Sequence, residues 1–116
     1  MKRAFVYLPA FEKELKNIGL DRDDEIDIEQ EILDNPEIGK VMKGTGGVRK
    51  FRKALSNTGK RGGVRIVYVD FPKYGKVYLI ELFSKNEKEN LTKEERNDLK
   101  KLISLLEIEA KRGVKS

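Results

Sequence analysis

The strongest candidate for chemistry in this chain is a stretch of unopposed positive charge between residues 43 and 65. It contains no Asp or Glu, and its cations are Lys43, Arg49, Lys50, Arg52, Lys53, Lys60, Arg61 and Arg65. Like charges repel one another in a folded chain, so such a run usually faces open solvent or an anionic partner. Glycine pairs at 46–47 and 62–63 let the backbone turn and approach a ligand closely. Both features suit phosphate, and the simpler interpretation is a solvated basic hairpin.

Cations of this kind could catalyse transfer of a phosphodiester within RNA, with the substrate's own 2′-OH as nucleophile. The site must remove the 2′-OH proton, stabilise charge on the phosphate and protonate the 5′-oxygen leaving group. Arginine suits the second task because its guanidinium is planar and permanently charged. A Lys or Tyr transfers protons only if clustered positive charge lowers its pKa well below about 10. Such an assembly is a weak nuclease alone, so we expect it to depend on a partner that positions the RNA.

Composition excludes several other kinds of site. The chain has 116 residues, which suits a single domain over residues 1–116, and a net charge of +5. Because it has no Cys and no His, it lacks disulfides, thiolate and imidazole nucleophile systems and most transition-metal ligands. We therefore expect no metal and no other cofactor. Without an apolar run of about 18–20 residues or a signal-peptide pattern, the expected location is cytoplasmic, with no membrane contact.

Hydrophobic periodicity predicts the element order β-α-α-β-β-β-α. Strands are expected at 4–7, 48–55, 64–69 and 77–83, and helices are expected to begin at Pro9, after an Asp21 N-cap, and after a Thr92–Glu95 capping box. Three consecutive strands joined by short turns form antiparallel hairpins, and the first strand joins a sheet edge. This predicts an α+β domain, a twisted, antiparallel-rich sheet with helices on one face and the other face left for function.

Negative charge is concentrated on the two predicted N-terminal helices. Residues 11–37 carry eleven acids and three bases. These acids are interpreted as a solvated outer face, and the alternative is a docking surface for a basic segment.

Three segments carry a resemblance to a known family: G-T-G-G-V-R-K-F-R at 44–52, G-K-R-G-G-V-R-I-V-Y at 59–68 and Y-L-I-E-L-F-S-K-N-E-K-E-N-L at 78–91. With Asn35-Pro36 and Gly39 before them, they resemble toxins of type II toxin–antitoxin systems in the RelE/ParE superfamily, specifically the HigB-like branch. The resemblance covers nearly the whole chain. It implies a RelE-like, microbial RNase-like fold and a metal-independent endoribonuclease (an mRNA interferase) that cleaves mRNA in the ribosomal A site. It also implies a cognate antitoxin, of the helix-turn-helix type, through which alone the protein would meet operator DNA.

The resemblance also implies roles for individual residues. Lys60, Arg61 and Arg65 match the family's catalytic cations, and Lys85 matches the lysine that closes the last strand. Arg61 and Arg65 would stabilise the phosphate, Lys60 or Lys85 would transfer the proton, and Tyr68 is a further candidate for proton transfer or base stacking. The candidate RNA-binding cations are Lys43, Arg49, Lys50, Arg52 and Lys53.

Simpler interpretations stay open at three of these positions. Tyr68 is in phase with Val64 and Ile66 and could belong to the core. Lys85 could simply be a charged residue at the end of a strand, and Arg52 could provide only general electrostatic attraction. For the whole protein, the alternatives are a ParE-like gyrase-poisoning toxin and a non-catalytic RNA-binding module. Some family members use a histidine in the site; this chain has none, which rules out an imidazole mechanism.

Overall fold

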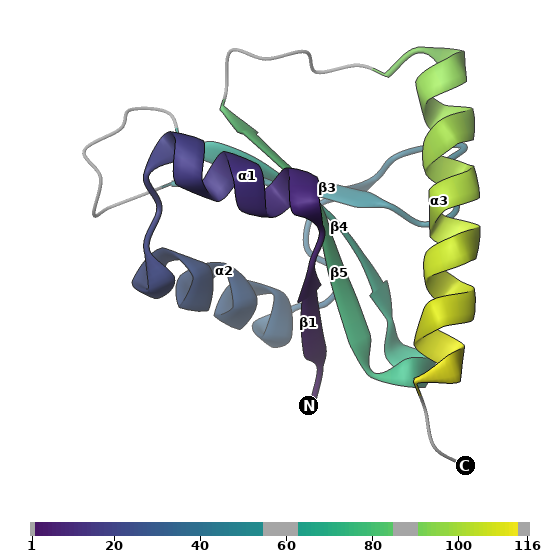
Figure 1. Cartoon of the computed structure of the whole chain (residues 1–116), viewed down its shortest axis with the longest axis horizontal. Coiled ribbons are helices and arrows are strands. Elements are labelled where there is room, and N and C mark those ends of the chain that lie inside the picture. Colours follow the sequence, from purple (N-terminus) through teal and green to yellow (C-terminus); the bar gives the residue numbers. More distant parts are fainter. Residues whose placement is uncertain (1, 55–62, 85–90, 114–116) are drawn as a thin grey trace.

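A twisted sheet organises the computed structural model, which describes residues 2–54, 63–84 and 91–113 (Figure 1). The strands of this described part are β1 (Ala4–Tyr7), β2 (Lys40–Val41), β3 (Arg49–Lys53), β4 (Val64–Phe71) and β5 (Lys76–Ser84), and its helices are α1 (Pro9–Ile18), α2 (Arg22–Asp34) and α3 (Lys93–Arg112). The strand order is β1-β5-β4-β3-β2, with β1 parallel to β5 and the other pairs antiparallel. The predicted α+β class is therefore confirmed. The two-residue strand β2, which pairs only with Arg49 and Lys50, was not predicted.

Local sequence signals account for the helix boundaries. Pro9 is the first residue of α1, and Gly19 ends that helix in a left-handed conformation. Asp21 caps α2, and its side chain accepts a hydrogen bond from the Asp24 amide. Thr92 and Glu95 form the predicted capping box of α3. None of the helices in the described residues is long and apolar enough to span a membrane.

Both faces of the sheet are covered, which corrects the expectation of helices on one face only. Figure 1 shows the strands running between α1 and α2 on one side and α3 on the other. Phe11 and Ile28 of the first two helices pack with one set of strand residues, while Ile103 and Leu106 of α3 pack with another. The physical reason is that β4 and β5 carry apolar side chains on both faces, so each face needs a cover.

An irregularity in β5 changes which side chains face α3. Val67 of β4 pairs with Glu81, whereas the next residue, Tyr68, pairs with Leu79, so Ile80 is an extra residue in β5. Such a bulge places two consecutive residues on one side of a sheet. Ile80 packs in the core under α3, and Glu81 lies beside Leu99 of α3. Strict alternation along the strand would have turned Glu81 toward α1 and α2.

Gly39 allows the chain after α2 to pass close to β3, and its substitution gives a stability prediction. Its φ is +90°, and a Cβ at this position would lie 2.3 Å from the Lys50 carbonyl oxygen. Gly19 has a similar φ of +85° but open space around it. We expect Gly19→Ala to cost about 1 kcal/mol of unfolding free energy and Gly39→Ala clearly more, roughly 3 kcal/mol, because a backbone clash adds to the strained φ. Urea unfolding of the two variants measures the difference; equal losses would contradict the close approach.

Candidate functional site

Strand β3 divides its four cations between the two faces of the sheet. Phe51, at its centre, is buried in the core beneath α1 and α2. Because side chains alternate along a strand, Arg49 and Lys53 share that side, whereas Lys50 and Arg52 lie on the side of α3. The register agrees, since Lys50 pairs with Val67, which belongs to the α3-side core.

Arg49 and Lys53 are held by groups of the chain itself. Lys53 Nζ lies 2.7 Å from a carboxylate oxygen of Glu31 in α2. Arg49 Nη1 donates to the carbonyl oxygens of Glu37 at 2.9 Å and Gly39 at 3.0 Å. These side chains tie the sheet to α2 and to the segment after it, and they lie on the face opposite Lys50 and Arg52. RNA binding by Arg49 and Lys53 stays a prediction.

The cations on the α3 side form a continuous row over β3 and β4. Arg52 of β3 is directly opposite Arg65 of β4, and Lys50 is two residues from Arg52 on the same face. Arg52 is exposed, and Lys50 and Arg65 are half-buried. Like charges directly opposite one another on a sheet are destabilising. A phosphate placed across this row, called here the arginine row (Lys50, Arg52 and Arg65), would relieve that repulsion and match the guanidinium geometry.

A cationic groove adjoins the arginine row. It has a volume of 190 Å³ and brings together side chains from β2, the following loop, β3 and α3. The described residues that line it are Lys40, Val41, Met42, Lys43, Lys50, Leu91 and Arg96. Four of these are cations and none is acidic. Lys43 and Lys50 were predicted RNA-binding residues, whereas Lys40 and Arg96 were not. Lys40 lies on β2, which was not predicted, and nothing in the sequence shows where the first turns of α3, with Arg96, lie against the sheet.

The loop that carries Lys43 is held closed by internal hydrogen bonds. The hydroxyl of Thr45, which is wholly buried, donates to the Met42 carbonyl at 2.6 Å and accepts from the Val48 amide at 3.2 Å. Gly46 lies against Ile103 of α3, where a Cβ would approach to 3.4 Å. A Cβ at this distance would be in ordinary contact, so it is the φ of +85°, rather than a lack of space, that favours glycine at position 46.

Tyr68 belongs to the core, which corrects its prediction as a residue for proton transfer or stacking. Its side chain is fully buried, and its ring contacts Phe51 edge-to-face at 5.7 Å between centroids. Its hydroxyl donates to the carbonyl oxygens of Pro36 and Ile38, at 2.9 and 2.8 Å. Burial raises the pKa of Tyr68 to about 12, opposite to the lowering that proton transfer would need. The alternative interpretation, in which Tyr68 is a core residue because it is in phase with Val64 and Ile66, agrees with this burial.

Three predicted catalytic residues, Lys60, Arg61 and Lys85, lie outside the described residues and stay predictions. Arg65 is therefore the one predicted catalytic cation that lies within the described residues. It brings Arg65 together with Arg52 and Lys50, which were predicted to bind RNA.

The bulge in β5 places the carboxylate of Glu81 on the α3 side of the sheet. Lys50, Val67 and Glu81 are paired across β3, β4 and β5, so the Cα atoms of Lys50 and Glu81 are two strand spacings apart, about 10 Å. Glu81 also lines an acidic groove of 250 Å³ with Glu95, Asp98, Leu91, Leu99 and Leu102. Within the described ranges, no group of three or more His, Cys, Asp or Glu side chains is arranged to hold a metal ion. A carboxylate beside phosphate-binding cations can accept a proton from a hydroxyl.

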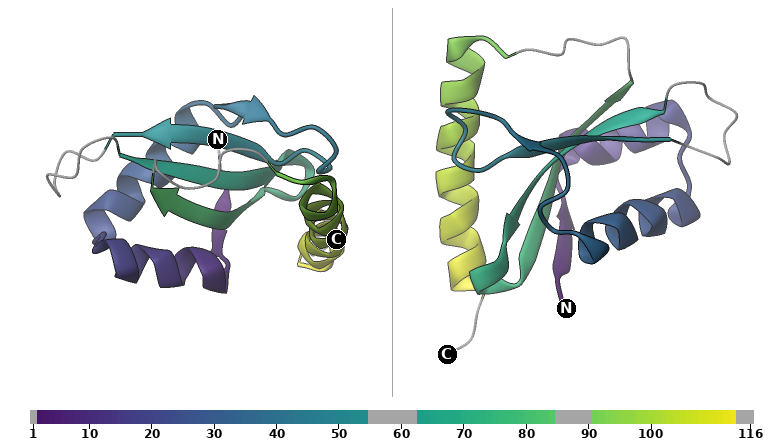
Figure 2. Two further views of the ribbon diagram at one scale, coloured as in Figure 1. Left: turned by 90° about the horizontal axis from the view of Figure 1, so that it is seen from above. Right: turned by 180° about the vertical axis from the view of Figure 1, so that it is seen from behind.

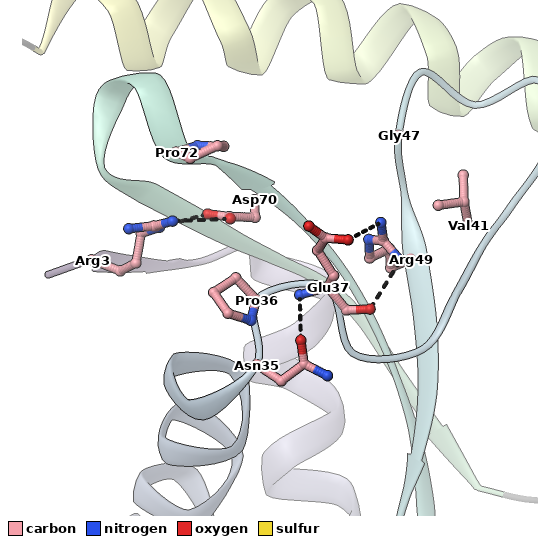
Figure 3. A pocket seen from close by; sticks show the side chains of 9 residues that line it. All are labelled: Arg3, Asn35, Pro36, Glu37, Val41, Gly47, Arg49, Asp70 and Pro72. Atoms are coloured by element: carbon pink, nitrogen blue, oxygen red, sulfur yellow. Dashed lines mark hydrogen bonds and ion pairs between the residues drawn. The ribbon is translucent and has the colours of Figure 1, made fainter. Parts of the chain in front are cut away.

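A larger cavity, of 520 Å³, lies at the end of α2 and has a different character (Figure 3). Its two arginines both face acids: Arg3 donates to both oxygens of Asp70, at 2.7 and 3.2 Å, and Arg49 lies 3.8 Å from the Glu37 carboxylate. The hydrogen bond to Asp70 raises the pKa of Arg3. Because these charges are compensated, this cavity offers less attraction to an anion than the cationic groove.

Comparison with solved structures identifies the fold. The chain is similar to a mutant of the E. coli toxin RelE in the free state, with a TM-score of 0.52 and 19% sequence identity over 74% of this chain and 86% of the other. The predicted RelE-like fold is therefore confirmed. No family model matches the sequence. Assignment to the HigB-like branch stays a prediction.

Proposed function

We propose that this protein is the toxin of a type II toxin–antitoxin system and that it cleaves mRNA on the ribosome as a metal-independent endoribonuclease. The observation that carries the proposal is the arginine row, which gathers cations from two strands on one face of a RelE-like sheet. A cognate antitoxin, of the predicted helix-turn-helix type, would neutralise the protein and bind operator DNA. The cytoplasm is the compartment in which these partners meet.

The described residues suggest how the reaction proceeds. Arg52 and Arg65 hold the scissile phosphate and stabilise the charge that develops on it. The carboxylate of Glu81 accepts the 2′-OH proton as the 2′-oxygen attacks phosphorus, which forms a 2′,3′-cyclic phosphate. The bond to the 5′-oxygen breaks, and that oxygen takes a proton from a cation, for which Lys60 and Lys85 are the predicted candidates. The row is open to solvent at Arg52, so the ribosome would supply the orientation of the RNA.

Arg65→Ala tests this proposal directly. We expect the variant to lose growth arrest on expression and to cut a translated mRNA roughly 100- to 1,000-fold more slowly, because one donor to the developing phosphate charge is removed. Primer extension on the mRNA measures the cuts, and circular dichroism checks that the variant folds. Arg112→Ala, the same change at an exposed residue in the last turn of α3, is the control and should behave as wild type.

The same assay separates the alternatives. Cuts at codon spacing support the endoribonuclease. Intact mRNA with damaged DNA would indicate a gyrase poison, and intact mRNA without growth arrest would indicate an RNA-binding module. Unchanged toxicity of Arg65→Ala would remove Arg65 from the site.

A further inference from the structure

We propose that the cationic groove binds a backbone phosphate of the RNA strand that is cut, next to the phosphate held by the arginine row. This inference rests on the proposed function, and it adds Lys40 and Arg96 to the residues that contact the substrate. The groove would thus fix the path of the strand away from the point of cleavage.

Charge is the first argument. Four cations from four separate segments line a groove of 190 Å³, and no described acid lines it. Within residues 2–54, 63–84 and 91–113, no ion pair joins Lys40, Lys43 or Arg96 to a carboxylate. Converging cations repel one another, so the groove is stabilised when an anion enters it.

The second argument is that the groove is formed before any ligand binds. Lys43 belongs to the loop closed by the buried Thr45 hydroxyl. A Cβ at Gly44 would lie 3.9 Å from Arg96 Cδ, so this loop lies directly beside the Arg96 side chain. Arg96 itself is in the capped first part of α3, where its amide donates to the Thr92 carbonyl at 3.0 Å. Binding would therefore cost little ordering of the backbone.

The third argument is continuity with the arginine row. Lys50 belongs to both, because it lines the groove and lies on the same face of β3 as Arg52, about 7 Å along the strand. Leu91 lines both the cationic groove and the acidic groove, and Glu95 and Asp98 in the acidic groove would repel a phosphate. A strand held by Arg52 and Arg65 is thus attracted toward Arg96 and repelled from Asp98. Met42 and Leu91 offer apolar walls for the sugar.

The test measures RNA binding separately from cleavage. The probe is a short, unstructured, fluorescein-labelled RNA with 2′-O-methyl groups, which cannot be cut because the nucleophile is blocked. Its affinity for the full chain is measured by fluorescence anisotropy over a range of salt concentrations. The variant Lys43→Ala/Arg96→Ala is compared with Lys101→Ala/Lys111→Ala, which removes the same charge from exposed positions on α3.

We expect Lys43→Ala/Arg96→Ala to bind roughly tenfold more weakly at low salt, and the slope of log affinity against log salt to fall in magnitude by about 0.7, because the contact with one phosphate is lost. The control should match wild type, and Lys43→Arg/Arg96→Lys should retain binding. The inference is overturned if the groove variant binds like the control, or if it binds the probe normally and loses only ribosome association. Failure of Arg65→Ala to abolish toxicity would instead count against the proposed function and leave this binding result standing.

Discussion

Removing Lys50 and Arg52 together is expected to weaken RNA binding at least tenfold in a variant that still folds. The two side chains lie on the α3 side of β3, where the arginine row and the cationic groove meet. Two phosphate contacts on a single strand account for about 1.4 in the slope of log affinity against log salt, so affinity and salt dependence should fall together. Growth arrest should be lost as well. Anisotropy with the 2′-O-methyl RNA and a urea unfolding curve measure the two effects in the same preparation.

The matched experiment removes Arg49 and Lys53, the other two cations of the same strand. Here we expect RNA affinity to change little and the unfolding free energy to fall by about 2 kcal/mol. The loss comes from the two hydrogen bonds that Arg49 donates to backbone carbonyls and from the ion pair between Lys53 and Glu31. Both double variants lose the same charge, so a general electrostatic effect cannot produce opposite outcomes. If both pairs weakened RNA binding equally, the division of β3 into two faces would be wrong as a guide to function.

Tyr68→Phe is expected to lower the unfolding free energy by about 1–3 kcal/mol and to leave cleavage by the folded protein unchanged. The substitution removes the hydroxyl that donates to Pro36 and Ile38, so these carbonyl oxygens lose their shared donor inside the protein. A catalytic tyrosine would show the reverse pattern, with stability kept and activity lost. Urea unfolding and primer extension distinguish the two roles.

The pH dependence of the same variant provides a second readout. The pKa of Tyr68 is raised to about 12 in the folded protein, above its usual value near 10. The neutral phenol therefore stabilises the fold fully below about pH 10, and this contribution is lost as the pH rises toward 12. The difference in stability between wild type and Tyr68→Phe should shrink over that window, while the contributions of all other groups are common to both proteins and largely cancel. A constant difference would show that the hydroxyl is not the stabilising group.

The sequence predicted the fold well because the signals involved are local. Pro9, Asp21 and the Thr92–Glu95 box act within one helical turn, and the structure has each of them in the predicted role. The placement of α3 was not predicted, since a period of three and four residues shows that a helix has an apolar stripe but does not show which face of the sheet it covers.

The site was harder to predict because it depends on which face each strand residue occupies. All four cations of β3 look alike in the sequence, and only the burial of Phe51 separates them into two pairs. Glu81 was missed because the extra residue Ile80 shifts the alternation of β5 by one. Arg96 was missed because it is an ordinary surface arginine until α3 is placed beside the loop at Gly44.

The short strand β2 has a consequence for solubility. It pairs with only the first two residues of β3, so the outer edge of β3 from Phe51 to Lys53 has no strand partner in the described part of the chain. Exposed edges of this kind recruit strands from other molecules, and charged side chains are a common protection against it. Arg52 and Lys53 stand on this edge, so a variant stripped of both would be prone to self-association even when it folds. In addition to the contacts of Lys53 with α2, charge on β3 is therefore expected to protect this edge from pairing with neighbouring copies.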